Sequence, residues 1–178
     1  MNPTFRTLTL IPVAAEQKPL FVRLTQEAFQ RGAEAEFGPI DQPVIPAEDI
    51  LESMDKPGSD SWFAQENGRI VGGAVIVPDE SDPHRRSLDI LFIAAGSEGR
   101  GLGHRIWKQL EACYPDTAVW ETHTPYFEKR NIHFYVNKCG FSIVEFFHPG
   151  HPDPHGIPEG TPGGSLFFRF EKRMNIVR

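Results

Sequence analysis

The pattern of apolar and polar residues changes period at a cluster of glycines near the middle of the chain. Residues 88–94 form a short apolar run of the kind found in buried β-strands. Beyond the cluster, apolar residues return at helical spacing, at Ile106, Trp107, Leu110, Cys113 and Tyr114. The glycines between the two patterns are Gly96, Gly99, Gly101 and Gly103. This change predicts a strand, a glycine-rich loop and a helix, in that order.

Before this stretch, the pattern predicts one strand and two helices. Alternating polar and apolar residues over 5–10 predict the strand. A helix is expected over 19–32, ended by Gly32, because one face of it is apolar at Leu20, Phe21, Leu24 and Ala28. A mobile loop rich in Gly, Pro and acidic residues then covers 32–46, and a short helix is expected over 47–54.

An antiparallel hairpin centred on Asn67-Gly68 is expected next. Both central residues of a type I′ turn need positive φ, which makes Asn-Gly the strongest short hairpin signal. Strand-like runs over 61–66 and 69–77 flank the pair. Gly72-Gly73 inside the second run predicts a bulge or a close backbone approach.

Downstream of the glycine-loop helix, the pattern predicts a strand, a helix and two closing strands. These are a strand over 118–121, a helix over 126–138 that stops before Gly140, and strands over 141–147 and 165–170. Between the last two lies a Pro/Gly-rich insertion at 149–164, which should project from the sheet as a long connection. We therefore expect a single domain over residues 1–178 that carries this insertion.

Composition and charge narrow the class of protein. A chain of 178 residues with 39% hydrophobic residues suits one domain with a substantial core. A net charge of −6 argues against a basic nucleic-acid-binding surface. No apolar run approaches the length of a membrane span, and the N-terminus lacks the features of a signal peptide. We expect a cytoplasmic protein that binds neither nucleic acid nor membrane, with Cys113 and Cys139 reduced.

The glycine loop is a candidate site for a bound anion. A helix entered through glycines presents unpaired backbone N–H groups, and its dipole favours phosphates. A P-loop is excluded because Gly103-His104-Arg105 lacks the required Lys and Ser/Thr. A Rossmann dinucleotide loop is a stronger rival, since Glu121 follows at the distance of a ribose-binding acid. It is disfavoured because residues 94–98 separate the strand from the motif and the upstream strands form a hairpin. A tight turn that binds nothing is the plain alternative.

The loop EGRGLG at residues 98–103 resembles the pyrophosphate loop of the GCN5-related N-acetyltransferases, the GNAT family, whose pattern is Gln/Arg-x-x-Gly-x-Gly/Ala at a helix start. Residues 137–141, NKCGF, are similar to the family's closing signature, Phe-Tyr-x-Lys-x-Gly-Phe. The order of the predicted elements resembles the family over nearly the whole chain. The resemblance implies an α/β acyl-CoA N-acyltransferase fold, with a mixed, mostly antiparallel central sheet flanked by helices. It also implies that the central strand and the strand after the glycine-loop helix splay apart.

The resemblance further implies an enzyme that moves an acetyl group from acetyl-CoA to a primary amine of a small molecule or peptide by direct attack. In such proteins the pantetheine arm pairs with the central strand and the pyrophosphate lies on the loop amides. The residues implied for acetyl-CoA binding are Phe92, Ile93, Ala94, Glu98, Gly99, Arg100, Gly101, Leu102, Gly103 and His104. Asn131 is a further candidate contact, with a helix N-cap as its alternative role. A non-catalytic acyl-CoA-binding sensor or interaction domain of the same fold is the alternative function.

Two departures from the family pattern bear on the site. Glu98 stands where the family has Gln or Arg, and a carboxylate repels a pyrophosphate unless it points to solvent or Arg100 and His104 compensate. The closing signature is also one residue too long. Counting from Phe-Tyr assigns the general acid to Tyr135, whereas counting from Gly-Phe puts Val136 there. We assign Tyr135, because valine has no proton to give and a local bulge can absorb the extra residue.

The general base must reach the acceptor amine and be ionised near neutral pH. Glu121 fits best, because it ends the strand that diverges from the central strand, where the thioester is implied. Its neighbours Trp120, His123 and Tyr126 could form an aromatic acceptor pocket. Asp89 on the central strand is the second candidate. Each of these residues also has a plain structural alternative. Glu121 can be a solvated carboxylate at a strand end, Asp89 can make a sheet-edge hydrogen bond, and Tyr135 can pack between helix and sheet.

The insertion carries several potential metal ligands, namely His148, His151, Asp153 and His155. The prolines between them would splay the side chains, so we assign no metal site and expect solvated loop histidines. The insertion could line the acceptor site or cross the interface of a homodimer, and the sequence leaves both open. The identity of the amine depends on this insertion and on the 32–46 loop.

Overall fold

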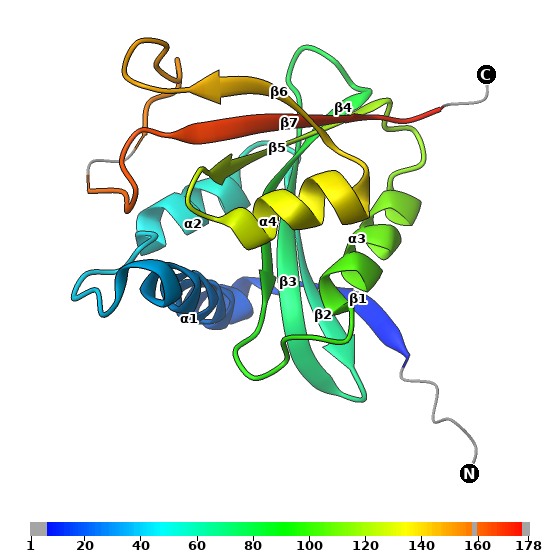
Figure 1. Ribbon diagram of the computed structural model, residues 1–178. Helices are drawn as coiled ribbons and strands as arrows, with labels where there is room; N and C mark the ends of the chain where they lie inside the picture. Colours follow the sequence, from blue (N-terminus) through cyan, green and yellow to red (C-terminus); the bar gives the residue numbers. More distant parts are fainter. Residues whose placement is uncertain (1–6, 158–159, 176–178) are drawn as a thin grey trace.

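A computed structural model describes residues 7–157 and 160–175 of the chain. Its seven strands form one sheet in the order β1-β2-β3-β4-β5-β7-β6 (Figure 1). The strands are β1 (Leu8–Pro12), β2 (Asp60–Glu66), β3 (Arg69–Pro78), β4 (Arg85–Ile93), β5 (Val119–Pro125), β6 (Ser142–Phe147) and β7 (Phe167–Arg173). The helices are the 3₁₀-helix η1 (Ala15–Gln17), α1 (Lys18–Phe37), α2 (Ala47–Asp55), α3 (Leu102–Cys113), α4 (Lys129–His133) and the π-helix η2 (Phe134–Cys139). All neighbouring strands are antiparallel except β4 and β5, which confirms the predicted mixed α/β fold.

The hairpin of β2 and β3 forms at the predicted turn. Asn67 and Gly68 have φ values of 51° and 76°, as a type I′ turn requires. Farther along β3, Gly72 and Gly73 let neighbouring backbone come close. A Cβ on Gly72 would lie 2.5 Å from the carbonyl oxygen of Phe92, and one on Gly73 would lie 2.8 Å from that of Trp62. The predicted close approach is therefore confirmed.

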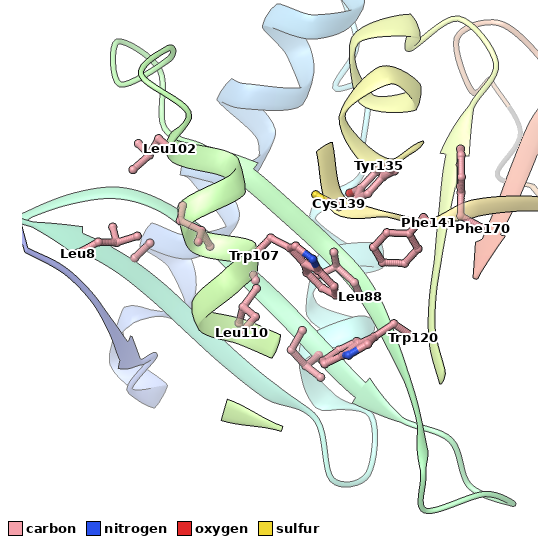
Figure 2. Packing of buried hydrophobic residues seen from close by; sticks show 14 of the residues in the cluster. Leu8, Leu88, Leu102, Trp107, Leu110, Trp120, Tyr135, Cys139, Phe141 and Phe170 are labelled. Carbon is pink, nitrogen blue, oxygen red and sulfur yellow. The ribbon is translucent and has the colours of Figure 1, made fainter. Parts of the chain in front are cut away.

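Two hydrophobic clusters cover the two faces of the sheet. On one face, α1 and α2 pack on the sheet, and Phe21 packs at a tilt against Phe63 and edge-on against Phe92. On the other face, α3 and η2 cover a second cluster, in which Trp107 of α3 meets Trp120 of β5 (Figure 2). No helix in the described part of the chain is long and apolar enough to cross a membrane.

The parallel pair in the middle of the sheet is short. Arg85–Ser87 of β4 pair with Val119–Glu121 of β5, and the two strands then separate, as predicted. Where the two strands begin to separate, the Thr122 hydroxyl of β5 donates a hydrogen bond to the backbone carbonyl oxygen of Leu88 in β4, at 2.9 Å. The pairing of β4 with β3 is irregular at Asp89. Ile90 pairs with Val75 and Leu88 pairs with Ile76, so Asp89 has no partner of its own in β3.

The first long helix extends beyond its predicted end. Gly32 does not stop α1, which continues to Phe37 and ends at Gly38, where φ is 79°. The segment after Gly32, Ala-Glu-Ala-Glu, has high helix propensity and outweighs one glycine. Gly32 instead makes room for Glu128, whose Oε1 would lie 2.9 Å from an added Cβ.

Two other element boundaries also differ from the prediction. The predicted helix over 126–138 begins only at Lys129, because the Tyr126 amide donates to the carbonyl of Leu166 and holds that segment beside the sheet. The strand predicted over 5–10 begins at Leu8, and residues 5 and 6 lie outside the described part. Cys113 and Cys139 are both free thiols, but only Cys139 is buried.

Candidate active site

The glycine loop between β4 and α3 folds in a conformation that requires glycine. Three consecutive residues have positive φ, namely Gly99 at 91°, Arg100 at 58° and Gly101 at 64°. These turns place the loop directly before Leu102, the first residue of α3. Within the described residues, the backbone amides of Gly103 and His104 donate to no carbonyl. The loop thus presents free N–H groups at the positive end of a helix, which suits a diphosphate.

Glu98 does not project freely into solvent. Its carboxylate accepts a hydrogen bond from the Gly96 amide at 2.8 Å and lies 3.2 Å from the Arg31 guanidinium of α1. The cation beside Glu98 is therefore Arg31, which the sequence gives no signal to find. The guanidinium of Arg100 instead lies 3.7 Å from the carboxylate of Glu66, and the His104 side chain is exposed.

Next to this loop, β4 has an open edge. Phe92 and Ile93 pair with β3 on one side, and no strand in the described part of the chain pairs with them on the other. The Ala94 amide continues the β3 pairing by donating to Val71 at 2.9 Å. A Cβ on Gly103 would lie 3.2 Å from Phe134, so α3 starts close against η2. The open edge and the free loop amides therefore adjoin, which suits an extended chain that ends in a diphosphate.

Asn131, the predicted contact or helix N-cap, has no capping role in the structure. The N-cap of α4 is Glu128, so Asn131 is the third residue of the helix and its side chain is exposed. The N-cap alternative for Asn131 is thus wrong, because the helix begins earlier than that role requires. Its contact with acetyl-CoA stays a prediction.

The extra residue in the closing signature is absorbed by the π-helix η2. A π-helix takes one more residue per turn than an α-helix, and here it spans Phe134–Cys139. Tyr135 lies in the core near Phe141 and Phe170 (Figure 2), and its ring also contacts Phe134. Burial raises the pKa of Tyr135, and a hydrogen bond with the Thr122 hydroxyl partly opposes that rise. The phenol therefore stays protonated at neutral pH, beside the point where β4 and β5 part.

On the α2 face of the sheet, the parting strands open into a cleft of about 620 Å³. Its walls come from α2, the end of β3, β4, β5 and the insertion. Seven carboxylates line it, namely Asp49, Glu52, Asp79, Glu80, Asp89, Glu121 and Asp153. Only three basic residues do so, Lys56, Arg85 and Arg86. The cleft is therefore acidic and attracts a cation.

The two predicted bases both face this cleft, but each already accepts several hydrogen bonds. Glu121 Oε2 accepts one from Arg85 and one from Arg169, both at 3.1 Å. The Asp89 carboxylate accepts three, from Ser87 at 2.6 Å, Ser53 at 2.9 Å and Lys56 at 2.8 Å.

The expected aromatic pocket around Glu121 does not form. Side chains alternate along a strand, so Trp120 points to the opposite face and packs in the core. Tyr126 lies beyond the end of β5, against Phe146 and Phe168. Of the three expected residues, only His123 lines the cleft.

One histidine of the insertion has a clear packing role. His151 bonds to Glu145 at 2.9 Å and stacks on Phe147, which fastens the insertion to β6. This contact positions Asp153 and His155 in the wall of the cleft. Among the described residues, no group of three or more His, Cys, Asp or Glu side chains is placed to hold a metal ion.

Comparison with known proteins places this arrangement in a family. The family model described as "Acetyltransferase (GNAT) family" matches residues 22–141. The chain belongs to the GNAT family. A GNAT neighbour among solved structures, an acetyltransferase from Elizabethkingia anophelis with acetyl-CoA bound, has a TM-score of 0.66 at 17% identity, over 94% of this chain and 98% of that one. Spermidine N-acetyltransferase from Vibrio cholerae, in complex with CoA and spermine, has a TM-score of 0.66 at 12% identity, over 95% of this chain and 96% of that one.

A closer relative by sequence is the uncharacterized protein YrkN of Bacillus subtilis. It is 43% identical over 163 residues, which cover 88% of each chain. The GNAT neighbours that carry acetyl-CoA or CoA support an acyl-CoA co-substrate for this fold. The loop amides and the open edge of β4 fit such a molecule.

Proposed function

We propose that this GNAT protein transfers an acetyl group from acetyl-CoA to a primary amine of a small molecule or peptide, by direct attack. The observation that carries the proposal is the acidic cleft at the split between β4 and β5, which adjoins the open edge of β4. An amine with a pKa near that of lysine is a cation at neutral pH, so seven carboxylates favour its entry.

Each part of the site has a separate task in this proposal. The amides from residue 98 to 104 hold the diphosphate, and the edge formed by Phe92, Ile93 and Ala94 pairs with the pantetheine arm. Bound acetyl-CoA supplies an activated thioester. Tyr135 lies at the split on the other face of the sheet from the cleft, as expected for the group that protonates the departing sulfur. Positioning and proton transfer are then the tasks of the chain.

The proposal is tested by turnover with a panel of amines. The protein is mixed with acetyl-CoA and monoamines, diamines, polyamines or peptides, and release of free thiol is followed. We expect thiol release that depends on both the protein and the amine. Calorimetry with CoA runs in parallel. Tight CoA binding without amine-dependent thiol release contradicts the proposal and favours the non-catalytic sensor.

The acidity of the cleft has its own test. Glu52 is exposed on α2 and lines the cleft, so Glu52→Gln removes one carboxylate with little structural cost. We expect KM for a cationic acceptor to rise about threefold, with KM for acetyl-CoA unchanged. Equal changes in both KM values would contradict a role for the cleft in binding the acceptor.

A further inference from the structure

We propose that His123 is the general base that takes the proton from the acceptor amine, an inference that rests on the proposed function. His123 follows Thr122 on β5, and the two side chains leave opposite faces of the strand. Thr122 contacts Leu88 and Tyr135 on the core face, while His123 lines the cleft. The base and the assigned acid thus reach the split between β4 and β5 from its two sides.

The competing bases in the cleft are already engaged in hydrogen bonds with other side chains. Two guanidinium groups share one oxygen of Glu121, and three donors hold Asp89. An incoming amine would have to compete with these donors for either carboxylate. In contrast, within the described residues the ring of His123 has no hydrogen-bond partner, and Glu121 Oε1 lies 4.0 Å from its Nε2.

Packing holds the imidazole in one plane. The ring of His123 stacks on Phe147, with centroids 6.1 Å apart and planes inclined by 15°. Phe147 is buried, and the ring of His151 also stacks on it, with centroids 5.8 Å apart and planes inclined by 9°. About a third of the His123 side chain, 32%, remains exposed, and that part faces the cleft. The ring is therefore fixed by its face while its edge stays available to an amine or to a water molecule.

The charges around His123 suit a base that works near neutral pH. Burial is the main cause that lowers the pKa of His123, and Arg169 of β7 lowers it further. Glu121 of β5, Asp153 of the insertion and Asp89 of β4 act in the opposite direction. The net effect is a lowered pKa, so the imidazole is neutral at pH 7. Once it takes a proton, the same three carboxylates stabilise the imidazolium.

The protons balance over one turnover. The ammonium form of the acceptor gives one proton to His123, and the neutral nitrogen then forms a bond to the acetyl carbon. The carbon–sulfur bond breaks and its electron pair leaves on sulfur, which receives a proton from Tyr135. The surplus proton of the new amide nitrogen replaces the one lost by Tyr135. His123 releases its proton to solvent, so amide, thiol and one proton are the net products.

The test is the pH profile of kcat/KM for wild type and His123→Asn, with the best amine of the panel. We expect kcat/KM at pH 7 to fall about 100-fold in His123→Asn. In wild type, kcat/KM should rise with pH through a midpoint below about 6.5, and this limb should be absent from the variant. The Kd for CoA should stay within about twofold of wild type, and the melting temperature should stay within about 3 °C. A merely structural role would leave the limb in place.

Two further variants make the result specific. Glu121→Gln should keep the limb but move its midpoint to lower pH, because the imidazolium loses a stabilising charge. His84→Asn, an exposed histidine outside the cleft, should leave the profile unchanged. A His123→Asn enzyme within threefold of wild type, with the same limb, overturns the assignment of His123 alone. Absence of turnover with every amine in wild type overturns the proposed function, and this inference with it.

Discussion

Arg31 on α1 and Glu98 in the glycine loop form an ion pair at 3.2 Å, across the gap between the first helix and the loop. The same carboxylate accepts the Gly96 amide, so its position is fixed from two sides. A negative side chain thereby sits in a loop whose amides suit a diphosphate, with a guanidinium beside it. The pair reduces the repulsion that Glu98 alone would exert on a phosphate.

Replacing Glu98 with Gln should strengthen CoA binding. Removal of one carboxylate near the diphosphate is worth about 1 kcal/mol in a partly solvated site, or about a fivefold lower Kd. Calorimetry at low salt measures the change, and raising the salt concentration should shrink it. Glu48→Gln, an exposed carboxylate at the start of α2, is the matched control. A weaker affinity in Glu98→Gln would mean that the carboxylate orders the loop more than it repels the ligand.

The partner residue gives an opposite expectation. Arg31→Gln leaves Glu98 without its cation, so CoA should bind about threefold to fivefold more weakly. In the Glu98→Gln background the effect of Arg31→Gln on CoA affinity should be smaller, because the carboxylate that Arg31 neutralises is absent. A double-mutant cycle on CoA affinity measures this coupling. Additive effects would show that the ion pair does not act on the ligand.

Local sequence rules were enough to predict most of the helices and strands. Asn67-Gly68 has the φ values that its turn requires, and the close approach at Gly72-Gly73 follows from two missing side chains. These features depend on short stretches of chain, where residue type limits the backbone directly.

What could not be predicted depends on contacts between distant segments. The ion pair of Arg31 with Glu98 and the stack of His123 on Phe147 join residues far apart in sequence. The sequence pattern predicts a helix end at Gly32, because its neighbour in space, Glu128, cannot be identified from the sequence. Trp120 points away from the cleft because alternate residues of β5 face opposite sides of the sheet. Which residues face which side is fixed only by the pairing of β5 with its neighbours.

The arginine–glutamate network beside the cleft should make stability depend on acid pH. A hydrogen bond from Arg85 is the main cause that lowers the pKa of Glu171, and Arg169 adds to it. A carboxyl with a lowered pKa stabilises the fold above its unfolded value of about 4.3, and the contribution is lost as pH falls through the folded pKa. The free energy of urea unfolding should therefore drop below about pH 4.5. Glu171→Gln should cost about 2 kcal/mol at pH 7 and flatten this drop, whereas Glu48→Gln should do neither.

Two glycines should respond differently to the same substitution. Gly72→Ala places a Cβ 2.5 Å from the Phe92 carbonyl, a backbone atom that the pairing of β3 and β4 holds in place. We expect a loss of about 3 kcal/mol in the free energy of unfolding. Gly101→Ala meets no atom within 4 Å and carries only the cost of a left-handed φ of 64°, about 1 kcal/mol. Urea unfolding of both variants measures the difference, and equal losses would contradict the packing argument.

Replacing Tyr135 with Phe tests the assigned acid with least disturbance of the core. The ring contacts with Phe141 and Phe170 remain, and Thr122 keeps its bond to Leu88, so CoA affinity should not change. Turnover should fall about 100-fold, because no proton donor meets the departing sulfur. Tyr114→Phe is the matched control: it loses bonds to Asp60 and Trp62, so it should lower stability by about 1 kcal/mol without slowing turnover. If Tyr135→Phe turns over as fast as wild type, Tyr135 has only a packing role between η2 and the sheet.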